Sequence, residues 1–184
     1  MPPLPTRPRG FTLIECLIAL AILSILMTLA APSWARLVGR THGRAAHAQL
    51  AVALNHARSA AASRGQNVVM CPSRDGGQCA RSTEWHHGWI SFADVDRNGM
   101  RTPDEPLLTV SQAQAHGTGI TGTEGRMRVT YRPDGSATGT NQTITVCDRR
   151  SGTDASALVI SQAGRVRSAP PSPDATAACL RAAG

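Results

Sequence analysis

One segment of the chain carries oxygen-bearing side chains at the spacing of a calcium-binding loop. Residues 94–105 read DVDRNGMRTPDE and fit the pattern D-x-D-x-N-G-x5-E. In such a loop the cation binds side-chain oxygens and one main-chain carbonyl. The candidate ligands are Asp94, Asp96, Asn98, Met100 through its carbonyl, and Glu105. Because predicted strands flank the segment and Arg97 and Arg101 lie in it, we prefer a polar hairpin loop without a cofactor, with calcium as the alternative.

A second group, Glu84, His86 and His87, has metal-binding residue types at an unfavourable spacing. Adjacent residues of a strand point to opposite faces, so the two histidines are poor joint ligands. We expect solvent-exposed side chains or a cross-strand pair. No Ser-His-Asp order, phosphate-binding glycine loop or pair of catalytic carboxylates stands out, and the sequence predicts a protein that is not an enzyme.

Arginines recur in pairs in the second half of the chain. The pairs are Arg126 with Arg128, Arg149 with Arg150, and Arg165 with Arg167, the last directly after Gly164. Residues i and i+2 of a strand share a face about 6.6 Å apart, which is comparable with neighbouring phosphates on one nucleic-acid strand. The pairs therefore indicate either contacts to nucleic acid or simply a soluble basic surface.

The composition is that of a small folded protein with few aromatic residues. Of the 184 residues 41% are apolar but only 3% are aromatic, so the core must be aliphatic and a large ring-lined pocket is disfavoured. All 19 basic residues are arginines, and the net charge is +7. This balance permits an acidic partner without requiring one.

Five cysteines indicate the compartment of the C-terminal part. Cys16 lies in an apolar run and serves there as a small apolar residue, whereas Cys71, Cys79, Cys147 and Cys179 lie beyond it. Four cysteines allow three pairings. Pairing of the first two would close a short loop, and pairing of the last two would hold the C-terminal tail on a strand. Neither spacing fits the C-x2–4-C pairs of a zinc site, so we expect disulfides and an oxidising space.

Residues 11–31 form an apolar run with a single charge, Glu15. As a helix the run is about 31 Å long, enough to cross a membrane. The preceding residues 1–10 are short, rich in proline and basic. An ordinary secretory signal ends its apolar run with a cleavage site, but here the obvious junction, between Gly10 and Phe11, precedes the run. An uncleaved signal anchor is the alternative.

The helical pattern continues to about residue 64. Pro32 should kink the helix or end its first part. Residues 33–64 are rich in alanine, and their later half has apolar residues at a 3-4 spacing, which predicts packing on a core. Gly39 and Gly43 are expected to loosen the middle, and Gly65 to cap the end.

From residue 66 the pattern changes to short runs broken by glycine, proline and aspartate. Predicted strands are residues 67–71, 88–94, 107–110, 126–131, 143–148, 157–161 and 165–168. Residues 132–135 (RPDG) predict a tight turn, and residues 162–164 the tip of a hairpin. The proline-rich residues 169–174 cannot continue a central strand. The predicted fold class is α+β, with a long bent helix packed on an antiparallel sheet.

Residues 9–15, RGFTLIE, resemble the cleavage signature of type IV prepilins and pseudopilins. In that family a membrane prepilin peptidase cuts after the glycine, and the new N-terminal residue is methylated. The resemblance implies processing at Gly10 and Phe11 and a guiding role in assembly for Glu15. It also implies a cleaved leader (1–10), a transmembrane segment (11–31), a soluble helical part (32–64) and a β-rich periplasmic or extracellular head (65–184).

Glu15 requires a partner on physical grounds. A carboxylate in an apolar run costs about 3 kcal/mol by insertion scales. Cleavage would free an α-amino group on Phe11, and a helix N-terminus also favours an anion. We expect Glu15 of one subunit to pair with the Phe11 amine of a neighbouring subunit.

Three further segments resemble the FimT/GspH minor pilins. These are residues 54–59 (LNHARS), residues 68–73 (VVMCPS), and Trp85 with residues 88–92 (GWISF). The resemblance implies a pilin fold, in agreement with the α+β pattern.

The segment Gly164-Arg165-Val166-Arg167 resembles the GRxR motif with which FimT-type minor pilins hold DNA during natural transformation. It implies non-specific binding of double-stranded DNA, with Arg126, Arg128, Arg149 and Arg150 as accessory contacts. The expected partners are DNA, other pilins, prepilin peptidase and the bacterial inner membrane before assembly. The alternative is a structural, GspH-like pseudopilin of a type II secretion system that does not bind DNA.

Overall fold

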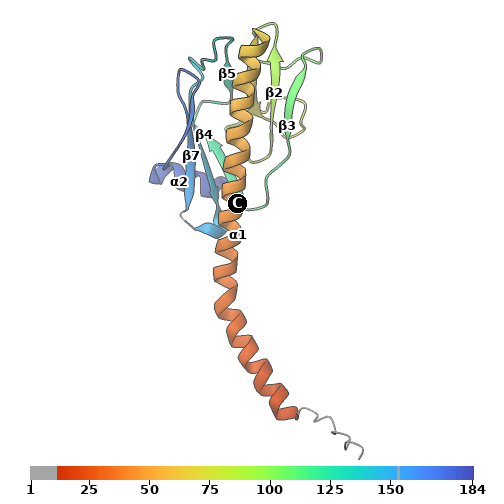
Figure 1. The fold of residues 1–184 in the computed structure, drawn as a ribbon, viewed down its shortest axis with the longest axis vertical. Helices are drawn as coiled ribbons and strands as arrows, with labels where there is room; N and C mark the ends of the chain where they lie inside the picture. Colours follow the sequence, from red (N-terminus) through yellow and green to blue (C-terminus); the bar gives the residue numbers. More distant parts are fainter. Residues whose placement is uncertain (1–11, 153) are drawn as a thin grey trace, which may run out of the picture. The chain divides into compact units, whose positions relative to one another are not determined.

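The computed structural model describes residues 12–152 and 154–184 and divides the chain into two units (Figure 1). The first unit ends at Ala35, and the second comprises Arg36–Gly184. Helix α1 (Leu13–Arg64) contributes to both units. The helix does not end at Pro32. It stops before Gly65, whose φ of +63° suits a glycine after the last helical turn.

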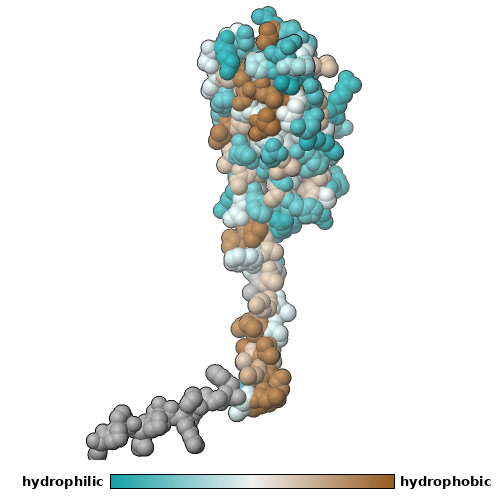
Figure 2. Space-filling model, turned by 90° about the vertical axis from the view of Figure 1, so that its right-hand side faces the viewer, coloured by the Kyte–Doolittle hydropathy of each residue, from teal (hydrophilic) through white to brown (hydrophobic). Residues whose placement is uncertain are grey.

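In the first unit, α1 exposes an almost continuous apolar surface (Figure 2). The exposed side chains include Leu13, Ile14, Leu17, Ile18, Leu23 and Leu26. By length and composition this part of α1 suffices to cross a membrane. An apolar surface of this kind needs lipid or neighbouring subunits around it.

The second unit contains two antiparallel four-stranded sheets. The first, in the order β3-β2-β1-β5, consists of Leu107–Ser111, Trp89–Asp94, Asn67–Pro72 and Val129–Tyr131. The second, in the order β4-β6-β7-β8, consists of Thr118–Gly122, Thr143–Asp148, Ala155–Ile160 and Val166–Ala169. A short 3-10 helix, η1 (Arg149–Ser151), follows β6, and helix α2 (Pro173–Ala182) ends the fold.

The C-terminal half of α1 packs on the inner faces of both sheets. Its buried stripe, Leu50, Leu54, Ala57 and Ala61, has the spacing expected from the sequence. Inward-facing residues of the two sheets and the buried Trp85, Trp89 and Tyr131 complete one core with this stripe. The predicted class, a long N-terminal helix on antiparallel sheets, is confirmed.

Gly39 does not loosen the helix as expected; it permits close packing. A Cβ at this position would lie 2.7 Å from Asp148 Oδ1 and 2.7 Å from the Ser151 amide nitrogen. A larger side chain would therefore separate α1 from the end of β6.

Two elements were not predicted from the sequence: β4, an edge strand of the second sheet, and α2, which packs on the outer face of that sheet. Strand β4 (TGITG) has a single large apolar residue, so its strand signal is weak. Its Gly119 is needed because a Cβ there would lie 2.8 Å from the Cys179 carbonyl oxygen. Helix α2 follows the proline-rich stretch because Ser172 caps it and proline occupies its first turn.

Each sheet carries one disulfide on its outer face. Cys71 is bonded to Cys79 and Cys147 to Cys179, the pairs that the sequence suggested. The second bond attaches α2 to β6. Cys16 of α1 is a free thiol.

Candidate functional site

The tip between β7 and β8 is a tight turn that depends on Gly164. The Gly164 amide donates to the Ser161 carbonyl (2.8 Å), and the φ of Gly164 is +73°. A Cβ at this position would overlap the carbonyl oxygen of Gly135, which belongs to the predicted turn at residues 132–135. The two turns thus pack backbone to backbone, and only glycine satisfies both the dihedral angle and the contact.

Arg58 of α1 joins these two turns. Its Nε donates to the Gly135 carbonyl (3.0 Å), and its Nη2 donates to the Ala163 carbonyl (3.3 Å). The sequence analysis did not assign this role to Arg58. The sequence shows only that Arg58 lies next to the buried stripe of α1, which includes Leu54 and Ala57. It does not show which distant residues the guanidinium contacts.

Strand β8 presents its arginines away from α1. Val166 packs against the core, and the Ser168 hydroxyl lies 2.9 Å from His47 Nε2 of α1. Because side chains alternate along a strand, Arg167 faces the opposite, outer side of β8, and Arg165 directly precedes the strand. Both are exposed, and Arg167 lies opposite Val159 of β7.

The guanidinium groups of Arg165 and Arg167 form no ion pair or hydrogen bond with the part of the chain that the structure describes. The main chain around them is well held, because the Arg165 amide donates to Ser161 Oγ (3.1 Å). The turn that packs on Gly164 contains Asp134, and hydrogen bonds from Ser136 lower the pKa of its carboxyl group. Two free cations on a fixed strand can contact anionic groups outside the protein.

The other predicted arginines are differently placed. Arg126 and Arg128 were expected to share a strand face, but the strand β5 begins only at Val129. Arg126 Nη1 donates to the Gly139 carbonyl, and Arg128 Nη1 to the Gly99 carbonyl (3.0 Å). The strand prediction was wrong for residues 126–128 because their backbone does not pair with a strand: the Arg126 amide donates to the Thr123 carbonyl (2.9 Å), and the Arg128 carbonyl accepts from the Gln142 side chain (3.2 Å).

Arg149 and Arg150 also differ from each other. Arg150 bonds to His42 Nδ1 (3.0 Å) and to the His116 carbonyl, and it lies 3.8 Å from Asp148 Oδ2. It therefore connects α1 to the end of β6. Arg149 is exposed. The structure does not bring this pair to β8.

The acidic loop after β2 is held by its own backbone. The carboxylates of Asp94, Asp96 and Glu105 have oxygens within 4.8 Å of one another. Glu105, however, accepts from the amides of Val95 (2.8 Å) and Thr102 (3.0 Å), and Asp94 accepts from Gly99 (3.1 Å). Burial raises the pKa of Asp94. These bonds hold the segment as a polar hairpin loop, and the calcium site at the same residues stays an alternative prediction.

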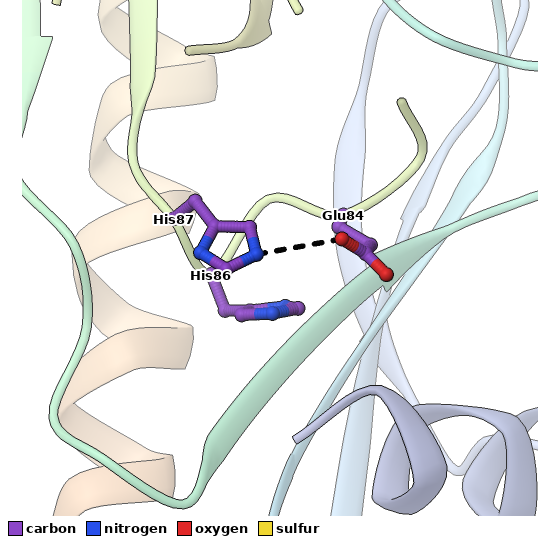
Figure 3. A group of neighbouring side chains, drawn as sticks. All are labelled: Glu84, His86 and His87. Carbon is purple, nitrogen blue, oxygen red and sulfur yellow. Dashed lines mark ion pairs between the residues drawn. The ribbon is translucent and has the colours of Figure 1, made fainter. Parts of the chain in front are cut away.

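Glu84, His86 and His87 lie together, contrary to the expectation from a strand (Figure 3). The two histidines occupy a turn, and their ring centroids are 4.2 Å apart. Glu84 Oε2 lies 3.4 Å from His87 Nε2 and accepts a hydrogen bond from Arg74 (3.3 Å). Burial lowers the pKa of His86. The Arg74 guanidinium and the His87 ring both contact Glu84 Oε2, so these side chains form a charged cluster.

Comparison with known proteins identifies the family. The family model described as type II transport protein GspH matches residues 46–164, and the prokaryotic N-terminal methylation motif matches residues 6–31. The chain belongs to the GspH family. No curated protein matches the sequence.

Two solved structures share the fold of this GspH-family chain. The type IV minor pilin FimU of Pseudomonas aeruginosa superposes with a TM-score of 0.57 at 22% identity, covering 71% of this chain and 90% of FimU. The minor pseudopilin EpsH of Vibrio cholerae superposes with a TM-score of 0.50 at 11% identity, covering 70% of this chain and 96% of EpsH. The chain is thus a GspH-family protein that shares the fold of a type IV minor pilin and of a minor pseudopilin.

The start of α1 adds a contact that the family motif did not reveal. Gly10 and Phe11 lie outside the described residues. Glu15 Oε2 accepts from the amide and the hydroxyl of Thr12 (both 3.1 Å), and the Glu15 amide donates to Thr12 Oγ1 (3.3 Å). This reciprocal arrangement is a capping box, which satisfies the helix N-terminus within one chain. Pairing of Glu15 with a neighbouring subunit would have to replace or share these bonds.

Proposed function

We propose that this GspH-family pilin binds double-stranded DNA without sequence preference, as a minor pilin that serves DNA uptake in natural transformation. The observation that carries the proposal is the pair of unbonded guanidinium groups of Arg165, directly before β8, and Arg167, on its outer face. Each can make a bidentate contact to a phosphate. Phosphate contacts carry no base information, so every sequence should bind equally well.

The rigid support of the pair favours this role over a merely soluble surface. The strand β8 is paired to β7, and the turn before Arg165 is held by Gly164 and Arg58. Guanidinium groups on a fixed main chain lose less conformational freedom on binding than groups on a flexible tail. A filament with several copies would gain avidity on one duplex.

Processing and location complete the proposal. A prepilin peptidase cleaves after Gly10, Phe11 becomes the methylated N-terminus, and the precursor is held in the bacterial inner membrane by residues 11–31. The two disulfides support a periplasmic or extracellular second unit. After cleavage, Glu15 exchanges its capping box for the Phe11 amine of a neighbouring pilin during assembly.

The test measures binding of a short fluorescent duplex to the mature chain in neutral detergent micelles. Arg165→Gln with Arg167→Gln should weaken binding about tenfold or more and reduce the salt slope by about 2, one for each lost phosphate contact. The control, Arg44→Gln with Arg64→Gln, removes the same charge from exposed positions of α1. Equal affinities of both double variants would reject the β8 site. A wild-type chain that binds no duplex would establish the structural pseudopilin instead.

A further inference from the structure

Four arginines surround one hollow of about 640 Å³ in the second unit. They are Arg81, Arg101, Arg126 and Arg128, and they come from three separate loops. The Cys71–Cys79 disulfide and Met100 also line the hollow. No acidic residue is among the described residues that line it.

Three of the four guanidinium groups are held in place by loop carbonyls. Arg101 Nη1 donates to Gly77 (3.0 Å), Arg126 to Gly139, and Arg128 to Gly99 (3.0 Å). The Nε group of Arg101 is buried and has no hydrogen-bond partner in the described part of the chain. None of the four arginines forms an ion pair with a described carboxylate.

This arrangement is unfavourable without an anion. Like charges that converge on one concave surface repel one another, and the low-dielectric walls strengthen the field there. Each anchored guanidinium keeps N–H groups that its carbonyl partner does not use, because arginine has five donors. An oxyanion in the hollow would accept these bonds and reduce the repulsion. Planar guanidinium groups suit phosphate oxygens in particular.

The hollow lies on the outer face of the first sheet. Val69, Cys71, Ile90 and Phe92 form a cluster on the outer face of the first sheet, whereas Val68 and Met70 face α1. The hollow contains Cys71 and therefore lies on the outer face. Arg167 lies on the outer face of the second sheet, and Arg165 directly precedes β8.

One loop connects the two sites. Gly139 lines the hollow and accepts from Arg126, while two residues earlier the Ala137 amide donates to the Gln162 carbonyl (2.8 Å) at the β7–β8 tip. The exposed Arg132 lies on the same connecting segment. A polyanion that contacts Arg165 and Arg167 can thus continue over residues 132–139 towards the hollow.

We propose that the four-arginine hollow is a second phosphate-binding site, which takes a backbone phosphate of the DNA held by β8. The proposal rests on the proposed DNA-binding function. It extends the contact from one strand to a surface that includes both sheets. It also assigns to Arg81 and Arg101, which no sequence pattern singled out, a role in holding the phosphate.

The experiment uses the mature full-length chain in neutral detergent micelles with two probes, a short duplex and inorganic tripolyphosphate. The hollow variant is Arg81→Gln with Arg126→Gln. Arg81→Gln alone serves where the double variant is unstable, because Arg81 is exposed and its side chain forms no hydrogen bond or ion pair with a described residue. The β8 variant is Arg165→Gln with Arg167→Gln, and the matched control is Arg44→Gln with Arg64→Gln. Thermal melts confirm that each variant is folded.

The hollow variant should bind duplex about three- to tenfold more weakly than the control, with a salt slope smaller by about 1 to 2. It should also lose calorimetric binding of tripolyphosphate, which the β8 variant retains. A hollow variant equal to the control with both probes overturns the hollow alone. A β8 variant equal to the control, with a weakened hollow variant, overturns the β8 site alone. Binding of tripolyphosphate without any binding of duplex overturns the DNA role of both.

Discussion

The two sheets of the second unit carry their arginines in different ways. Arg167 lies on the strand β8, where alternation places it on the outer face, and Arg165 directly precedes the strand and is exposed as well. Beside the first sheet the arginines stand on loops, and loop carbonyls hold three of the four guanidinium groups. The first arrangement leaves the cations free, and the second fixes them around a hollow. An arginine site at a regular strand can therefore be predicted from the sequence, whereas one built from several loops cannot.

The largest expected effect concerns the disulfides, which support the two sheets unequally. Replacing Cys147 and Cys179 by serine should lower the free energy of unfolding by about 4 kcal/mol, because the bond closes a long loop across α2 and β6. The same change at Cys71 and Cys79 should cost about 2.5 kcal/mol, because that loop is short. Chemical denaturation measures both values. A larger cost at the short loop would show that the first sheet depends more on its disulfide.

The next effect tests the turn that supports β8. Gly164→Ala should cost about 3 kcal/mol, because the new methyl group meets the Gly135 carbonyl and the residue keeps a positive φ. Gly139→Ala is the matched control: its φ is +85° but nothing lies within 4 Å of its Cβ, so about 1 kcal/mol is expected. Urea denaturation compares the two variants. Equal costs would mean that glycine is required at residue 164 because of its positive φ and not because of the packing of the two turns.

A smaller effect follows from the side chain that joins the same turns. Arg58→Met keeps the length of the side chain but removes the donors to Gly135 and Ala163, which should cost about 2 kcal/mol. Amide exchange at Gly135 and Gly164 should become faster. Arg64→Met, at the exposed end of α1, should change neither the stability nor the exchange rate. Unchanged exchange in the Arg58 variant would contradict the joining role.

The smallest effect depends on pH and tests how β8 is attached to α1. His47 lies 2.8 Å from Ser156 Oγ of β7 and 2.9 Å from Ser168 Oγ of β8, and burial lowers its pKa. In the unfolded chain the pKa is near 6.5, so below this pH the unfolded state binds more protons than the folded one. Stability should therefore be complete above about pH 6.5 and fall as the pH decreases.

Melting temperatures at pH 7.5 and 5.5 check this dependence. His47→Gln should reduce the loss of stability on acidification, and His56→Gln, a change at an exposed position of α1, should leave it as in the wild type. An identical pH dependence in all three proteins would show that the loss of stability at low pH comes from groups other than His47.

Much of the fold could be predicted because its signals are local. The 3-4 spacing of Leu50, Leu54, Ala57 and Ala61 predicts a helix face that is buried. The residues RPDG at positions 132–135 predict a tight turn. Strand β4 could not be predicted, because two of its five residues are glycines that are needed for close packing, Gly119 against α2 and Gly122 against the side chains of Gln142 and Trp85. The histidine pair was misread for a related reason: residues 86 and 87 are in a turn, where alternation does not apply.

By itself, the sequence determined the N-terminal motif, the apolar run, the helix-then-strands order, and the exposed pair Arg165 and Arg167, because each depends on neighbours within a few positions. Only the tertiary structure decided the contact of Gly164 with Gly135, the role of Arg58, and the hollow of four arginines. Those features join residues tens of positions apart, and their geometry depends on how loops from different strands meet. Charge counts along the chain cannot show which arginines have a carbonyl partner and which remain free to bind an anion.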